Sequence, residues 1–405
     1  MIKNSKIMNC SVVLMIIASS TFLSLDTAIA GTYGSAERTK VILLKSEALD
    51  ETREIFIRTP PNYDPENRTY PVVYVLDGES NFELVASYLD YMFNYDIYPE
   101  MIVTGVRNVN RNRDYVPRPD DNFEDSGKAD MFLEFVKDNW IDTVEKSYSS
   151  SGERILIGHS FGGVFTLHTL FSEPALFDAY IALGASAWVA NGVLYEEARA
   201  YFANPRDADA FVYMAVGEGD GGPTVPSSRD LAAIFEEEAP QTLDWTFDIT
   251  PKTDHFKNFA SGMHDAFMAW FPAWGFADQV INRARSDGSK GVNQWFNDKR
   301  ETLGPRFQPA WFDIGVTAFA LTQEGNGDAA MTVIENLKIH YPNSAHVASF
   351  GASIFEMNGH YEKALNEYER SLVLVIKQKL HPNMVHKGKL ERGVERMREQ
   401  LSTRN

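Results

Sequence analysis

The chain has 405 residues, a length that corresponds to about two domains or to one large domain with an appendage. Hydrophobic residues make up 44% of the chain and charged residues 23%, so wholesale disorder is excluded and there are enough apolar side chains for a sizeable core. The formal net charge of −18 argues against binding to nucleic acid or to an anionic membrane surface, and Lys and Arg form no run typical of a nucleic-acid site.

The first 30 residues show the three parts of an export signal in their usual order. Lys3 and Lys6 give a positive beginning, a mostly apolar stretch follows over residues 11–25, and Ala28-Ile29-Ala30 provides the small residues of a cleavage site. The apolar stretch is too short, and too interrupted by serine, for a membrane span. We therefore expect residues 1–30 to be a signal peptide and the mature protein to be periplasmic or secreted, without attachment to a membrane. The only cysteine lies in this segment, so no disulfide is expected.

Between residues 41 and 271, short apolar runs alternate with segments of helical periodicity. Strands that alternate with helices are typical of a three-layer α/β fold with a mainly parallel sheet. The predicted strands are 41–44, 54–58, 72–76, 101–106, 155–157, 179–183, 211–216 and 245–249. The predicted helices are 129–148, 164–171, 231–238 and 262–271.

After residue 276 the strand-like runs stop and the pattern becomes helical, so a small all-helical region is expected over 277–405. Within it, five residues recur 34 positions later: Ala318, Leu321, Gly325, Ala330 and Ile334 are followed by Ala352, Phe355, Gly359, Ala364 and Tyr368. This period resembles that of tetratricopeptide repeats and predicts about two units over approximately 311–376. Because two units are marginal on their own, we expect them to pack against the first domain, to self-associate or to bind a protein partner.

The motif Gly158-His159-Ser160-Phe161-Gly162 is the chemically most informative part of the sequence. It follows the predicted strand 155–157 directly and precedes a helical segment, which is the context of a nucleophile elbow. A sharp turn between strand and helix points the serine hydroxyl away from the sheet, and small flanking residues let the backbones approach. Ser160 is therefore the candidate nucleophile, and the N–H of Phe161 is a candidate oxyanion donor. The alternative is a glycine turn with a structural role only.

Four stretches resemble the putative-esterase family of α/β hydrolases, which includes S-formylglutathione hydrolase, siderophore esterases, feruloyl esterases and mycolyltransferases. They are 70–78, which ends in Leu-Asp-Gly, 111–117, with the pattern Arg-x-Arg-Asp-x-x-Pro, 154–163, which contains the elbow, and 176–182. The resemblance implies an α/β-hydrolase esterase domain over 31–276. It also implies a serine carboxylic-ester hydrolase that acts through an acyl-enzyme on a small-molecule ester. The elbow is nearest to the siderophore-esterase branch, so a siderophore lactone is one candidate substrate.

A catalytic serine needs a base and an acid that orients the base, and in α/β hydrolases the order along the chain is Ser, acid, His. His255 follows the predicted strand 245–249, where the family's base normally lies. His264 falls inside a predicted helix and is the alternative base. The family's acid tends to lie three residues past the glycine that ends the strand 211–216, which favours Asp220, with Glu218 as the alternative.

Further site residues are implied by the same resemblance. The turn Gly78-Glu79 is expected to supply the second oxyanion donor. Arg111 and Arg113 could line the mouth of the pocket and bind a carboxylate or phenolate, or they could form a structural salt bridge with Asp114. Trp188 resembles an aromatic residue near the family's acyl pocket, although it could equally be a packing residue.

Two other functions remain open from the sequence. An acyltransferase would use the same scaffold, with an alcohol in place of water. An interaction protein would bind a partner through the helical repeats and retain a vestigial hydrolase domain. No metal or cofactor is expected, because the sequence contains no metal-binding motif, P-loop or dinucleotide fingerprint, and a serine hydrolase needs none.

Overall fold

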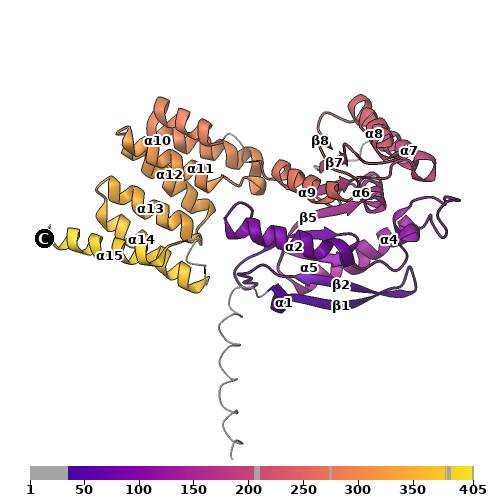
Figure 1. Ribbon diagram of the computed structural model, residues 1–405, viewed down its shortest axis with the longest axis horizontal. Coiled ribbons are helices and arrows are strands. Elements are labelled where there is room, and N and C mark those ends of the chain that lie inside the picture. The colour runs from indigo at the N-terminus through magenta and orange to yellow at the C-terminus, as the bar shows by residue number, and fades with distance from the viewer. Residues whose placement is uncertain (1–34, 205–209, 273–275, 379, 381–384, 404–405) are drawn as a thin grey trace, which may run out of the picture.

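The computed structural model describes residues 35–204, 210–272, 276–378, 380 and 385–403. The expected signal peptide over 1–30 lies outside these residues. The described chain forms an α/β part followed by an all-helical part, which lie side by side in Figure 1. Within the described ranges, no helix combines the length and the apolar character needed to cross a membrane.

A single sheet of eight strands forms the centre of the α/β part, in the order β1-β2-β4-β3-β5-β6-β7-β8. All neighbouring strands from β4 to β8 are parallel, and the hairpin of β1 and β2 is added to one edge by antiparallel pairing of β2 with β4. The predicted mainly parallel sheet is therefore confirmed. The strands are β1 (Thr39–Ser46), β2 (Glu51–Arg58), β3 (Tyr70–Val75), β4 (Ile102–Val106), β5 (Ser150–His159), β6 (Ala179–Leu183), β7 (Phe211–Gly217) and β8 (Asp244–Thr250).

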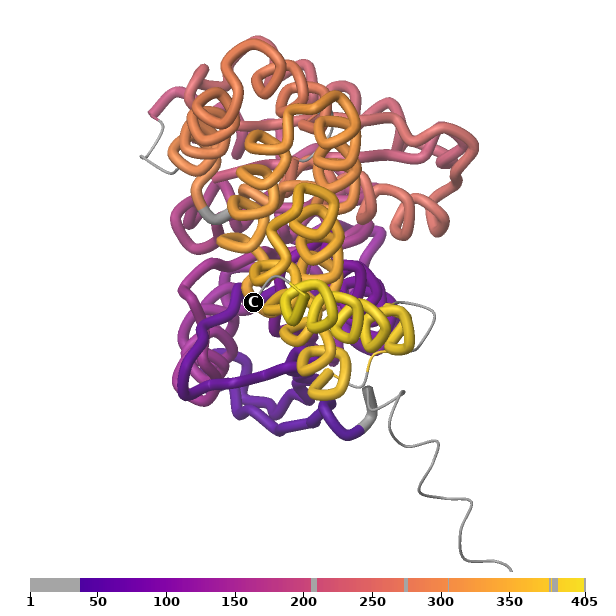
Figure 2. The backbone as a smooth tube through the Cα atoms, turned by 90° about the vertical axis from the view of Figure 1, so that its left-hand side faces the viewer, coloured from indigo at the N-terminus to yellow at the C-terminus, as the bar shows by residue number. Residues whose placement is uncertain are grey.

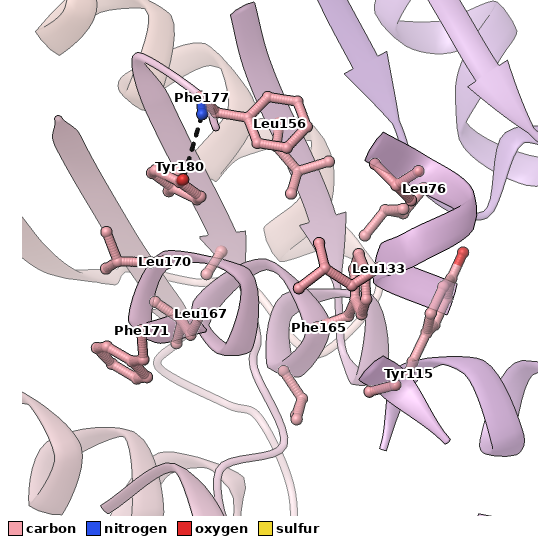
Figure 3. Close-up of a cluster of buried hydrophobic side chains, with 14 of the residues drawn as sticks. Leu76, Tyr115, Leu133, Leu156, Phe165, Leu167, Leu170, Phe171, Phe177 and Tyr180 are labelled. Carbon is pink, nitrogen blue, oxygen red and sulfur yellow. Dashed lines mark hydrogen bonds between the residues drawn. The ribbon is translucent and has the colours of Figure 1, made fainter. Parts of the chain in front are cut away.

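Helices cover both faces of the sheet and give it two apolar cores. Along β3, Val72 and Tyr74 point into one core while Val73 and Val75 point into the other, because successive side chains of a strand alternate between faces. The first core lies under α4 (Ala129–Phe135), α6 (Phe161–Ser172), α7 (Val189–Ala203) and α8 (Thr224–Glu238), and Figure 3 shows part of it around α6. The second core lies under α2 (Gly78–Asn94) and α9 (Lys257–Trp270).

The predicted helix over 129–148 is divided in the structure. A six-residue π-helical segment, η1 (Val136–Ile141), separates α4 from α5 (Asp142–Ser147). It brings the Nε1 donor of Trp140 within 2.9 Å of the hydroxyl of Thr104 on β4, and both side chains are buried. A π-helical turn is not visible in a pattern read with a period of 3.6 residues, so the sequence predicts one continuous helix. The remaining short helices of this part are α1 (Ser35–Arg38) and α3 (Arg111–Tyr115).

The C-terminal part is built from paired helices around a separate apolar core. The pairs α11–α12 and α13–α14 begin 34 residues apart, and all ten residues of the predicted repeat except the two glycines are buried apolar side chains. The bounds are α10 (Phe276–Leu303), η2 (Gly304–Arg306), α11 (Trp311–Gln323), α12 (Gly327–His340), α13 (Ala345–Met357), α14 (Tyr361–Lys377) and α15 (Lys387–Ser402). The long α10 is itself two helices joined at Gly288, whose φ of 58° breaks the helix, so the helical part begins with a further helix pair that the 34-residue period does not include.

The helical part contacts the α/β part near the N-terminal ends of the parallel strands. Asp96, just after α2, accepts hydrogen bonds from Ser344 at 2.5 Å and from His346 at 3.0 Å. Arg306 forms an ion pair with Asp244, the first residue of β8, at 3.2 Å. Ser160 follows the last residue of β5 and therefore lies at the C-terminal ends of the strands. The helical part is at the other end of these strands. Figure 2, viewed from the side of the helical part, shows this part (orange to yellow) in front of the α/β part.

Candidate active site

The predicted elbow is a sharp turn between β5 and α6. Ser160 has φ 59° and ψ −116°, a conformation that is costly for a residue other than glycine and that occurs mainly at functional sites. Its N–H donates to the carbonyl of Leu183 at 2.9 Å, which fixes the turn against β6. A Cβ atom at position 158 would lie 2.2 Å from the carbonyl oxygen of Gly162, so the turn requires glycine there.

The hydroxyl of Ser160 lies beside a second hydroxyl. Its Oγ is 3.3 Å from Oγ of Ser186, a residue that is 3% exposed and lies in the loop after β6. Among the described residues, no hydrogen bond joins Ser160 to His255. Contacts between a nucleophile and its base are often loose when no substrate is bound, so this geometry is compatible with the predicted pairing.

His255 and Asp220 lie in the loops that follow β8 and β7, and the structure brings them together. Nδ1 of His255 lies 2.8 Å from Oδ2 of Asp220, whose side chain is 3% exposed. Because a carboxylate accepts, Nδ1 carries the proton and Nε2 is left free to accept one. The alternative acid, Glu218, accepts a hydrogen bond from the N–H of Lys252 at 3.0 Å. His264 lies on α9, where its Nδ1 contacts the hydroxyl of Tyr88 at 2.8 Å.

Two helices begin at the candidate oxyanion donors. Phe161 is the first residue of α6 and Gly78 is the first residue of α2. The first N–H groups of a helix have no partner within it and lie at the positive end of the helix dipole, so both termini suit a developing negative charge. Gly78 is tightly packed, because a Cβ there would lie 2.8 Å from the carbonyl of Val106. The carboxylate of Glu79 accepts hydrogen bonds from the main-chain and side-chain nitrogens of Asn108 at 3.1 and 2.9 Å.

The structure gives the two predicted arginines different surroundings. Arg111 binds Asp77 through two nitrogens, at 2.6 and 3.1 Å, and its Nη2 also donates to the carbonyl of His159 at 2.8 Å. The salt bridge with Asp114 is present for Arg113 only, at 2.7 Å, and Arg113 also pairs with a second carboxylate, on Glu51. Arg113 is therefore part of a structural ion network, and Arg111 ties the turn after β3 to the elbow.

Trp188 contributes to an aromatic wall next to Phe161. Its ring centroid lies 5.8 Å from that of Phe123 and 6.4 Å from that of Phe161, and the rings of Phe123 and Phe161 meet edge to face at 4.9 Å. Trp188 is half-buried, and its Nε1 is a buried donor without a hydrogen-bond partner among the described residues. Phe123 was not predicted, because it lies in a loop with no family motif of its own.

His168 lies in a buried charge cluster on α6, the helix that follows the nucleophile. It is 4% exposed and contacts Asp130 at 3.1 Å and Glu197 at 3.0 Å. Burial alone would lower the pKa of His168, but the two carboxylates outweigh burial and raise it to about 9. The imidazolium of His168 therefore has a structural role, because it holds α6 to α4 and α7. In the sequence, this role is indicated only by a polar residue within an otherwise apolar helix.

Comparison with known protein families gives an independent result. The sequence profile of the family described as "Putative esterase" matches residues 46–274. The protein YbbA of Bacillus subtilis, which is described as uncharacterized, is 26% identical over 184 residues, or 44% of this chain and 72% of that protein. The siderophore enterobactin esterase of Emericella nidulans is 40% identical over 88 residues, but the aligned part is 21% of this chain and only 28% of that protein.

The fold has solved relatives. The crystal structure of an IroE-like serine hydrolase from Shewanella oneidensis superposes with a TM-score of 0.57 at 23% identity. The superposition covers 75% of this chain and 99% of that one. At this level of identity the likeness shows the fold, and it confirms the predicted α/β-hydrolase architecture.

Proposed function

This chain belongs to the putative-esterase family and is a serine esterase, and we propose that Ser160 is its nucleophile, His255 its general base and Asp220 the acid that orients the base. The observation that carries the proposal is the hydrogen bond of 2.8 Å between His255 and Asp220 in the loops next to a strained serine. Chain order supports it too, since Ser160, Asp220 and His255 follow one another as in other α/β hydrolases.

The proposed reaction has two steps. The hydroxyl oxygen of Ser160 bonds to the ester carbonyl carbon while its proton passes to Nε2 of His255, and Asp220 stabilises the imidazolium that forms. The oxyanion is held by the N–H of Phe161 and by an N–H of the turn Gly78-Glu79. The ester C–O bond then breaks, the alcohol leaves with the proton from His255, and water releases the acyl group from Ser160 by the same steps. None of these steps requires a metal or an organic cofactor.

The substrate that we propose is a small ester or lactone of the siderophore type. The similarity to the enterobactin esterase supports this substrate class. The aromatic wall of Phe123, Phe161 and Trp188 also supports it, because aromatic surfaces next to the nucleophile suit an acyl or alcohol group that carries a ring. The guanidinium of Arg111, which is paired with Asp77, packs over the ring of Phe161 at 5.4 Å from its centre and helps to hold this wall in place. Export through the N-terminal signal is part of the same proposal.

The test is a substrate panel with the purified mature protein. Short-chain p-nitrophenyl esters, aryl esters and a catecholate trilactone are assayed with wild type and with Ser160→Ala. We expect turnover of aryl or lactone esters that is lost in Ser160→Ala, and a burst of product that marks the acyl-enzyme. Transfer of the acyl group to an added alcohol, in preference to water, would identify an acyltransferase. Absence of turnover across the panel would contradict the proposed substrate class.

A further inference from the structure

His159 joins the nucleophile turn to the loop of the candidate base. It immediately precedes Ser160, and its Nε2 lies 2.7 Å from the main-chain oxygen of His255. The centroids of the two imidazole rings are 4.6 Å apart. A carbonyl oxygen can only accept a hydrogen bond, so Nε2 of His159 carries the proton and donates. One side chain next to the nucleophile thereby holds the main chain of the base.

The surroundings of His159 keep its ring neutral. The residue is 9% exposed, and burial, together with the nearby His255, lowers the pKa of His159 to about 4. The charges that face it are Asp77 and Arg111, which are paired with each other, and Phe259 of α9 packs edge-on at 5.7 Å. A neutral ring places no second positive charge beside His255 when that residue accepts a proton.

The main chain of His159 takes part in a second contact. Arg111 donates to its carbonyl oxygen at 2.8 Å while binding the carboxylate of Asp77 through two nitrogens. The turn after β3, the elbow after β5 and the loop after β8 are therefore connected through His159. These are the three segments that carry the proposed oxyanion donors, nucleophile and base.

We propose that His159 is a positioning residue of the esterase, whose N–H fixes the loop of His255 at the distance from Ser160 that proton transfer needs. The inference rests on the proposed roles of Ser160 and His255. Since no hydrogen bond joins those two described residues directly, their relative placement depends on what holds their main chains. A displacement of about 1 Å between reacting groups can lower a rate by about 10²-fold, so this anchor affects turnover even though it never touches substrate.

The experiment compares His159→Gln with His159→Met. The two replacements have nearly the same length and shape, but only glutamine retains an N–H donor at its end. We expect His159→Met to lower kcat per active site by about 10- to 100-fold with KM within about twofold, and His159→Gln to recover most of the loss. Active sites are counted by fluorophosphonate labelling of Ser160, so misfolded protein does not enter kcat. His360→Met, at an exposed position just before α14 of the helical part, is the matched control and should keep wild-type turnover.

The outcomes separate the two proposals. Wild type that is not labelled at Ser160 would refute the proposed function. Labelled wild type together with equal kcat per site for His159→Met and His159→Gln would overturn the positioning role alone. If His159→Met does not fold, His159→Asn replaces it, since its shorter amide cannot span the distance to the carbonyl of His255. In that case, His159→Asn with the kcat of His159→Gln would equally overturn the role.

Discussion

The carboxylate of Asp220 and the imidazole of His255 lie 2.8 Å apart, although 35 residues separate them in the chain. Their contact follows from topology, because β7 and β8 are parallel neighbours and their C-terminal loops emerge side by side. The N–H of Gly219 also donates to the carbonyl of Thr253 at 2.8 Å, so the acid loop and the base loop are joined by their main chains as well.

Replacement of the acid is therefore expected to impair the base. Asp220→Asn should lower kcat by about 10²- to 10⁴-fold, because the amide no longer stabilises the imidazolium or fixes its tautomer. Glu218→Gln is the matched control, since the carboxylate of Glu218 accepts a hydrogen bond from the main chain of Lys252, and it should stay within about threefold of wild type. Ester turnover measures both variants. A larger loss in Glu218→Gln than in Asp220→Asn would reverse the assignment.

The nucleophile can be identified by covalent labelling. A fluorophosphonate should modify Ser160, and Ser160→Ala should lose about 10³-fold or more of kcat, since no other group forms the acyl-enzyme. Ser186 is the serine with which the label could be confused, because its hydroxyl lies only 3.3 Å from that of Ser160. Ser186→Ala should remain labelled at position 160. Mass spectrometry of the digested protein that finds the label on Ser186 would contradict the assignment.

The charged His168 predicts a dependence of stability on pH. Its pKa is raised from 6.5 to about 9 in the folded protein, so its contribution to stability is fully present below pH 6.5 and is lost as the pH rises through 9. The free energy of unfolding should therefore fall between pH 6.5 and 9, and His168→Gln should flatten this decline. Urea unfolding at several pH values checks it. An equal decline in wild type and variant would show that other groups cause it.

The buried ion network around Asp114 should be sensitive to the loss of one charge. Asp114 and Arg53 both have fully buried side chains and lie 2.6 Å apart. Asp114→Ala leaves the guanidinium of Arg53 without this partner, which should cost about 3–5 kcal/mol of unfolding free energy. Asp142→Ala, which removes an exposed ion pair with Lys146, should cost about 0.5 kcal/mol or less. If denaturant titrations gave similar losses of unfolding free energy for the two variants, the result would argue against a special role of the buried network.

Much of the fold could be predicted because its signals are local. The strand 179–183 was predicted with its observed bounds, and all seven other strands overlap their predicted segments. The helix α2 was missed, since it begins directly at Gly78 within a motif that was assigned to a turn. The break at Gly288 was also missed, because a single positive φ between two helices leaves no trace in hydrophobic periodicity.

The candidate site was predictable where a motif or a strand end marks a residue. Ser160, His255 and Asp220 were chosen from such positions, and the structure brings the last two into contact. The partner of Arg111 could not be predicted, because its ion pair with Asp77 joins segments 34 residues apart, and α3 is placed by its packing against α4 and α6. The role that we propose for His159 depends on a side-chain contact across 96 residues, which no sequence pattern encodes.

The attachment of the helical part has a practical consequence for handling the protein. This part joins the sheet at the N-terminal end of β8. The helix α15 therefore lies far from the loops that carry the proposed catalytic residues (Figure 1). A resin, an electrode or a fluorescent tag coupled through the exposed face of α15 would thus leave the approach of an ester to these loops unobstructed. Immobilised enzyme coupled in this orientation should retain the turnover of the free protein.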